Sequence, residues 1–152
     1  MYKDLLAQAK KEIEMADHMC FVTFPLVNET KFLLSILSHI TSAAKLCLKS
    51  LLEFDKKPAG NNPFSELYAY KELEQKYKLD PKYFRLLQKL FELQRADLES
   101  NIRFKRGEKY ILSLSGFEKI TILDINLIKR YLLLTKKFIS DCSNIILTRQ
   151  NV

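Results

Sequence analysis

The sequence predicts a mainly α-helical, single-domain bundle of about five helices, residues 1–152, with a small β-hairpin before the last helix. Only three Gly and four Pro occur in 152 residues, which favours long helices over a fold with many turns. Thr30–Phe54 is apolar nearly all round, as expected of a helix in the middle of a bundle. Alternation typical of strands replaces helical spacing in only one region, before the last helix.

The first half of the chain is expected to hold two long helices and a connector. Apolar residues at helical spacing predict a first helix from Tyr2 to about Cys20. Pro25 forbids an unbroken helix through the apolar segment that follows, Phe21–Val27, so we predict a buried, kinked connector there. The long central helix comes next, and the candidates for its cap and acidic first turn are Asn28, Glu29 and Thr30.

Start signals place the remaining helices. Asn62 followed by Pro63 predicts a third helix, Phe64 to about Tyr77. Asp80 followed by Pro81 predicts a fourth, which extends to about Ile102, and Asp124 is the expected cap of the last helix, Ile125 to about Thr148. Between these helices, two β-branched and aromatic runs flank a turn and predict the hairpin, with strands at 109–114 and 118–123.

The positive charge lies in the second half of the chain. Through Lys76 there are ten Lys and Arg against ten Asp and Glu, whereas from Tyr77 onward there are fifteen against eight. The whole net charge of +7 therefore belongs to the second half. A basic half joined to a neutral half is typical of chains that meet polyanions, although it also occurs in proteins that bind none.

The best candidate binding segment is Arg103–Tyr110, where four cations and two aromatic residues lie between a helix and a strand. Lys and Arg hold backbone phosphates, and unpaired bases stack on aromatic rings. A structural explanation stays open, in which the cations neutralise the end of the preceding helix and the aromatic rings are core. The residues that we predict to bind nucleic acid are Arg103, Phe104, Lys105, Arg106, Lys109, Lys119, Lys129 and Arg130.

The sequence gives no catalytic or metal site that we can assign. The two histidines, His18 and His39, are not paired with Glu at the spacing of a helical zinc site, and Cys-x-x-Cys is absent. Three scattered glycines do not make a phosphate-binding loop. We expect no metal and no cofactor, and we favour a binding protein over an enzyme. An enzyme with a distributed site that uses one of the histidines stays open.

The cysteines and the start of the chain bear on location. Cys20, Cys47 and Cys142 are odd in number, widely spaced and set in apolar helical patterns, as expected of buried thiols in a reduced compartment. No leader pattern opens the chain, so we expect a cytoplasmic protein. Thr30–Phe54 is long enough to span a membrane, but several charged and polar residues interrupt it, and we expect no membrane contact.

The layout resembles the small all-α HEPN group (higher eukaryotes and prokaryotes nucleotide-binding domains). The resembling features are Ala16, Asp17 and His18 at the close of the first helix, the long apolar Thr30–Phe54, a shorter third helix and an amphipathic last helix. Members are commonly dimeric, and many are ribonucleases or partners of nucleotidyltransferases in toxin–antitoxin pairs. The nuclease members carry an arginine followed by a histidine. Here both histidines precede the first arginine, Arg85, so the resemblance implies a non-nuclease member without transferable catalytic residues.

Several functional hypotheses follow. The leading one is a non-enzymatic module that binds nucleic acid, RNA above all, or a nucleoprotein. The alternatives are a protein-interaction or antitoxin-like subunit of the HEPN type and a winged helix-turn-helix protein that binds DNA, although the fourth helix looks too evenly apolar for a recognition helix. We also expect a homodimer, because the long helix and a second side of the fourth helix offer more apolar surface than one neighbour covers. That second side consists of Tyr83, Leu86, Leu90 and Leu93.

Overall fold

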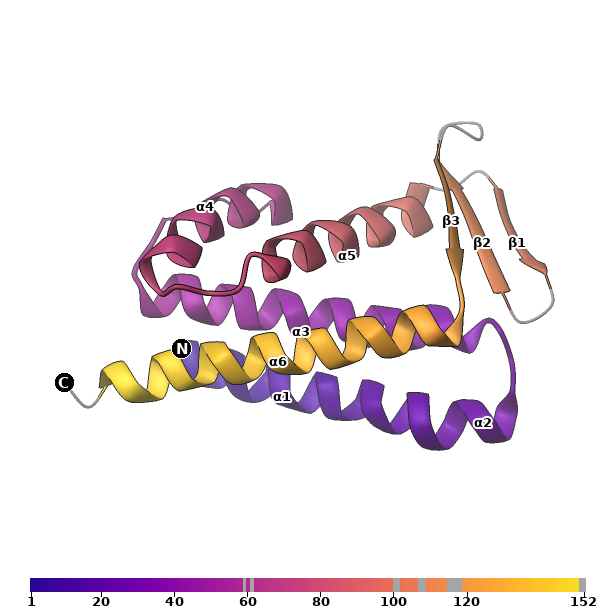
Figure 1. Cartoon of the computed structure of the whole chain (residues 1–152), viewed down its shortest axis with the longest axis horizontal. Helices are drawn as coiled ribbons and strands as arrows, with labels where there is room; N and C mark the ends of the chain where they lie inside the picture. The colour runs from indigo at the N-terminus through magenta and orange to yellow at the C-terminus, as the bar shows by residue number, and fades with distance from the viewer. Residues whose placement is uncertain (59, 61, 100–101, 107–108, 115–118, 151–152) are drawn as a thin grey trace.

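The computed structural model confirms a mainly α-helical bundle. It describes residues 1–58, 60, 62–99, 102–106, 109–114 and 119–150, with side chains described outside 96–121 and 150. The elements in chain order are α1 (Tyr2–His18), the π turn η1 (Met19–Thr23), α2 (Phe24–Val27), α3 (Phe32–Phe54), α4 (Pro63–Lys76), α5 (Lys82–Glu99), β1 (Ile102–Arg106), β2 (Lys109–Leu114), β3 (Lys119–Leu123) and α6 (Ile125–Gln150). Figure 1 shows the helices packed along one another and the strands gathered at one end.

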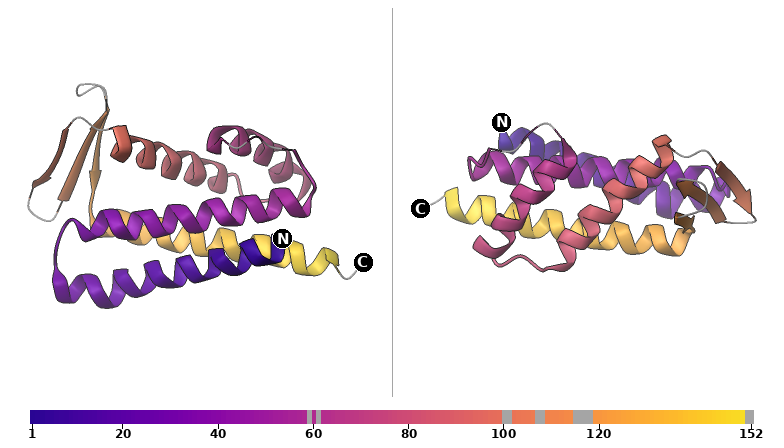
Figure 2. Two further views of the ribbon diagram at one scale, coloured as in Figure 1. Left: turned by 180° about the vertical axis from the view of Figure 1, so that it is seen from behind. Right: turned by 90° about the horizontal axis from the view of Figure 1, so that it is seen from above.

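Helix α3 lies at the centre, as its composition predicts. It packs against α1 and α6 along its length and carries α4 and α5 on another side. Its buried positions extend from Leu33 to Leu52 and include residues on more than one face. Figure 2 shows that α3 and α6 run in the same direction, that α1 runs in the opposite direction, and that both termini lie at the end away from the strands. The buried apolar residues of all these helices form one cluster.

Among the described residues, α3 is also the one helix whose length and composition would allow it to cross a membrane. Half of its most apolar stretch is buried against other parts of the protein. A central helix of a water-soluble bundle has the same composition, because it too is surrounded by apolar side chains. The position of α3 inside the bundle therefore accounts for its apolar composition.

The predicted buried connector before α3 is wrong in two respects. Pro25 does not interrupt the helical path, because the chain widens into a π turn in which the Phe24 N–H donates to the Met19 carbonyl, five residues back. A wider turn loosens the hydrogen-bond ladder where proline lacks an N–H and would crowd a carbonyl. The segment is also largely exposed rather than buried, and Leu26 is 83% exposed. The helical path ends at Asn28, which adopts the left-handed conformation.

Three of the four predicted helix starts are confirmed by side-chain caps. Asn62 Oδ1 accepts from the Phe64 N–H at 2.9 Å, Asp80 Oδ1 accepts from the Lys82 N–H at 2.9 Å, and Asp124 Oδ1 accepts from the Leu127 N–H at 2.8 Å. The exception is α3, whose N-cap position is Lys31 and has no side-chain cap. Backbone hydrogen bonds hold the start of α3, because the N–H groups of Phe32, Leu33 and Leu34 donate to the carbonyls three residues before them.

The hairpin is confirmed and belongs to a larger sheet. Strands β2 and β3 pair antiparallel, with Tyr110 opposite Leu123. An additional strand, β1, pairs antiparallel with β2 in the order β1-β2-β3. The fourth helix was predicted to extend over the start of this strand, to about Ile102, whereas α5 ends at Glu99. Helix α5 contacts β2, and Leu123 is buried while Ile122 is 47% exposed, so the sheet leans on the bundle.

The apolar surface expected to be surplus on the fourth helix is covered within the chain. Tyr83, Leu86, Leu90 and Leu93 of α5 are all buried. The central helix is likewise enclosed by its neighbours, as described above. The prediction of a homodimer therefore loses the surfaces on which it rested and stays a prediction.

One polar cluster ties the end of α3 to α4 and gives a pH-dependent contribution to stability. Asp55 accepts hydrogen bonds from Lys76 Nζ at 2.6 Å and Tyr77 Oη at 2.5 Å. Burial by itself would raise the pKa of Asp55, but the two hydrogen bonds outweigh it, so the pKa lies below its ordinary value. A depressed pKa stabilises the fold above the unfolded-state value, and that contribution is lost as the pH falls through the folded-state value.

We therefore expect Asp55→Asn to destabilise the protein by on the order of 1 kcal/mol near neutral pH, because one charged acceptor of two hydrogen bonds is lost. The difference from wild type should begin to shrink as the pH falls below about 4, where the unfolded chain takes up the proton, and should vanish as the pH falls through the lower folded-state pKa of Asp55. Urea unfolding of both proteins over this pH range measures it. A destabilisation that does not change with pH would contradict the assigned role.

Candidate nucleic-acid interface

The basic segment predicted from the sequence lies on the sheet. Arg103, Phe104, Lys105 and Arg106 occupy β1, while Lys109 lies on β2 and Lys119 on β3. In the register, Lys105 pairs with Tyr110 and Arg106 with Lys109. The side chains of these residues lie outside the described part of the structure. What the structure shows is that their backbone positions gather at one end of the bundle (Figure 1).

The two predicted residues on α6 face different neighbours. Lys129 Nζ lies 5.4 Å from the centre of the Phe21 ring, so this cation is turned toward the end of α1. Arg130 is exposed and lies one helical turn before Leu134, on the side of α6 toward α5. The structure thus does not bring Lys129 and Arg130 together into one patch.

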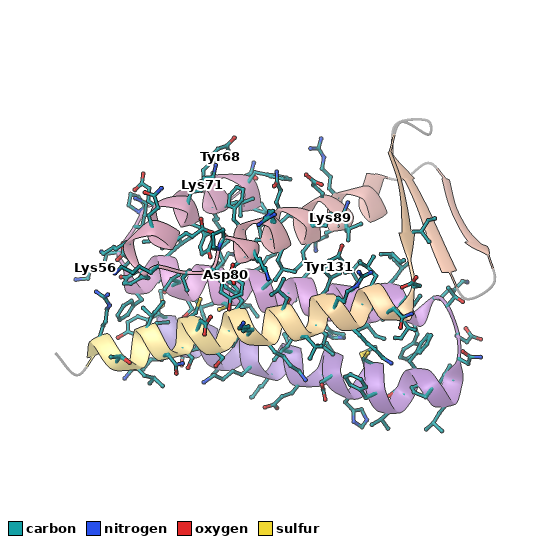
Figure 3. The ribbon with its side chains drawn as sticks, in the orientation of Figure 1. Lys56, Tyr68, Lys71, Asp80, Lys89 and Tyr131 are labelled. Carbon is teal, nitrogen blue, oxygen red and sulfur yellow. The ribbon has the colours of Figure 1, made fainter. Side chains whose placement is uncertain are left out.

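A second basic site, which the sequence analysis did not single out, lies between α5 and α6. An open groove of about 490 Å³ is lined by Lys82, Arg85, Leu86 and Lys89 from α5 and by Tyr131 and Leu134 from α6. Lys82, Arg85 and Lys89 are exposed. We call these three the α5 cations. Figure 3 labels Lys89 and Tyr131, one residue from each wall of this groove.

The groove follows from helical spacing on each wall. The α5 cations stand at positions i, i+3 and i+7, which fall on one face of a helix. On α6, Arg130 and Lys137 precede and follow Leu134 by four and three residues, so they border the groove on the other side. The spacing of the α5 cations is visible in the sequence. Their position opposite Tyr131 depends on tertiary packing, which the local sequence pattern does not predict.

Positive charge is concentrated at the start of α5. The α5 cations occupy the first two turns of the helix, where the aligned peptide dipoles already place positive charge. The first turn contains no acidic residue, and none of the three cations is in an ion pair with a described residue. The N-cap carboxylate of Asp80, whose Oδ1 accepts from the Lys82 N–H at 2.9 Å, supplies one negative charge against these three cations. An anion in the groove would relieve this arrangement.

Tyr131 adds a hydrogen-bond donor and an aromatic surface to the groove. Burial raises the pKa of its hydroxyl, with nearby Arg130 acting in the opposite direction. Tyr131 therefore keeps its proton at neutral pH and can donate to a phosphate oxygen. Together with Leu86 and Leu134, its ring gives the groove an apolar floor beside the cations.

The histidines do not form a candidate catalytic site. His39 Nδ1 lies 2.6 Å from Glu12 Oε2, which ties α3 to α1. His18 is exposed at the end of α1. No group of three or more potential metal ligands occurs among the described residues. Cys20, Cys47 and Cys142 are buried free thiols, as the sequence predicts.

The core also holds polar groups that do not reach the surface. The Tyr70 hydroxyl, Glu74 Oε1 and the Thr135 hydroxyl are buried without a hydrogen-bond partner among the described residues. Burial raises the pKa of the Tyr70 hydroxyl far above its ordinary value, with Cys142 the next contributor. This hydroxyl is therefore fixed in its neutral form. Because it opens onto no described groove, we do not assign it to the functional site.

The charge distribution on α5 predicts a gain in stability on losing a cation. We expect Lys82→Glu to stabilise the protein by roughly 0.3–1 kcal/mol at low ionic strength, because an acidic side chain suits the first residue of a helix and removes repulsion with Arg85. Thermal unfolding at low and high salt measures this change. Lys82→Gln should give a smaller gain, and a loss of stability in both variants would show that Lys82 has a structural partner instead.

Comparisons of the chain with protein-family models, with curated proteins and with solved structures find no match.

Proposed function

We propose that this protein binds single-stranded nucleic acid, most readily RNA, through the groove between α5 and α6. The observation that carries the proposal is the set of α5 cations, which are exposed, clustered at the positive end of a helix and not paired with described acidic residues. Proteins tolerate such local electrostatic conflict chiefly where function requires it. A phosphate backbone is the ligand that this arrangement suits best.

The two walls of the groove suggest how the strand is held. The α5 cations contact successive backbone phosphates, and the Tyr131 hydroxyl donates to a phosphate oxygen. The apolar floor, Leu86 and Leu134 with the Tyr131 ring, accepts an unpaired base. A stacked duplex keeps its bases inside and offers no such group, which favours a single strand over double-stranded RNA.

The distribution of charge along the chain also supports binding of a nucleic acid. The entire excess of positive charge comes from residue 77 onward, the part of the chain that contains α5, the sheet and α6. Helix α5 ends beside the sheet, whose strands carry the remaining predicted binding residues (Figure 1). A strand bound in the groove can therefore continue toward Arg103, Lys105 and Arg106 of β1.

A charge-reversal experiment tests this function. Binding of a labelled single-stranded RNA of about 16 nucleotides is measured over a salt series, and log K should fall linearly with log salt, by about 0.7 for each phosphate contacted. We expect Arg85→Glu combined with Lys89→Glu to weaken binding at least about tenfold and to reduce the slope by about 1.4. The matched control is Lys3→Glu with Lys11→Glu, two exposed α1 cations and the same change in net charge.

The control should keep most of the affinity. Equal losses in both double variants would mean that only net charge matters, and binding indifferent to salt would end the proposal. A third variant replaces Arg103, Lys105 and Arg106 with Glu. If it abolishes binding while the groove variant does not, the sheet rather than the groove is the interface.

Duplex DNA is the second candidate ligand. Helices α4 and α5 are followed by the sheet, the element order of a winged helix-turn-helix protein. The objection that α5 is too evenly apolar is weakened, because its outward side is polar at Arg85, Gln88 and Lys89. A mixed-sequence DNA duplex in the same assay separates the two candidates. Tighter binding to the duplex than to the single strand would favour this second function.

A further inference from the structure

A cluster of exposed apolar residues lies in η1 and α2. Phe21, Val22 and Val27 are each 47% exposed and Leu26 is 83% exposed, so four of the ten exposed large apolar residues among the described ones fall within seven consecutive positions. We call these four residues the apolar tip. The sequence pattern predicts that this segment is buried, so its exposure is known only from the fold.

The apolar tip projects from one end of the bundle. It lies where α1 turns into α3, at the end opposite both termini (Figures 1 and 2). The π turn keeps the chain helical through Pro25, and the left-handed residue Asn28 then reverses it. As a result these exposed side chains lie at the corner where the chain reverses.

Two cations flank this corner. Lys129 Nζ lies 5.4 Å from the centre of the Phe21 ring, and Lys31 is exposed where the chain turns into α3. Glu29 is the one acidic residue of the segment from Met19 to Lys31, while Asp17, one turn before Phe21, is paired with Lys136. The sheet that carries the cations of β1 stands at the same end of the bundle.

The size of the apolar tip decides between possible occupants. Its exposed side-chain area is on the order of 400 Å², while a stable protein interface buries about 800 Å² on each partner. A second copy of the chain or a rigid protein partner would therefore gain too little from this corner alone. A lipid surface has no such requirement, because a few inserted apolar side chains with flanking cations suffice for reversible binding.

We propose, against the expectation of no membrane contact that the sequence gives, that the apolar tip inserts into the surface of an anionic membrane, with Leu26 deepest and with Lys31 and Lys129 near the lipid headgroups. The long axis of the bundle then points away from the membrane. The groove between α5 and α6 lies along the side of the bundle and stays open to a nucleic acid. The two surfaces are separate, so this inference does not rest on the proposed function.

Co-sedimentation with lipid vesicles tests the inference. Vesicles of equal parts phosphatidylcholine and phosphatidylglycerol are compared with pure phosphatidylcholine, at about 0.15 M and about 0.5 M salt. We expect the wild type to bind the anionic vesicles and to retain part of that binding at the higher salt, because apolar insertion is not screened. We expect Leu26→Glu and Val22→Glu each to reduce the binding at least about tenfold.

The matched control is Leu147→Glu, an exposed leucine toward the other end of the bundle on α6 with the same change in charge. It should bind vesicles as the wild type does. Both tip variants should keep the wild-type unfolding midpoint and RNA affinity, since they replace exposed side chains away from the groove.

Three results would overturn the inference. The first is a wild type that stays in the supernatant with both kinds of vesicle. The second is an equal loss of binding in Leu147→Glu and Leu26→Glu, which would mean that charge alone attracts the protein. The third is a wild-type dimer that Leu26→Glu converts to a monomer, which would assign the tip to self-association.

Discussion

Enclosure of α3 is the constraint on which the rest of the structure depends. Small buried residues lie on α3 and on the neighbouring α1, including Ala43 and Ala44 on the first and Ala9 and Ala16 on the second. Small side chains let two helices approach closely, which raises the number of dispersion contacts for each buried residue. Helix α6 then covers a second side of α3, and α4 and α5 cover another.

Charge and apolar exposure follow from this enclosure. Because α5 directs apolar residues to more than one neighbour, only a narrow stripe of the helix is left for solvent, and cations concentrate there at its positive end. The packing of α6 against α5 turns that stripe into one wall of a groove. At the far end, the reversal between α1 and α3 leaves Phe21, Val22, Leu26 and Val27 exposed, whereas Cys20 is buried in the core.

Local signals predict the elements well and their exposure less well. Helical spacing predicts α3 to within two residues, alternation predicts β2, and Asn62, Asp80 and Asp124 cap the helices that they were expected to start. These signals act between residues close in sequence. Strand β1 was missed because Ile102–Arg106 is short and mixes apolar with basic residues, and it is a strand because β2 pairs with it.

The candidate site illustrates the same limit. The repeat of Lys82, Arg85 and Lys89 can be read in the sequence, whereas their meeting with Tyr131 depends on how α5 crosses α6. The exposure of Leu26 depends on a π turn that the presence of Pro25 does not reveal. In both places the local pattern was identified correctly. The burial and the neighbours of these residues were not predicted, because residues far apart in the chain determine them.

Native-state hydrogen exchange tests the central claim most directly, since it reports how each backbone amide opens. If α3 is the enclosed spine of the bundle, its amides between Ile36 and Leu51 should exchange the most slowly in the protein, at the rate set by global unfolding. Amides of the exposed π turn should exchange much faster. Exchange of the α3 amides through local opening, ahead of those of α1 and α6, would contradict the account.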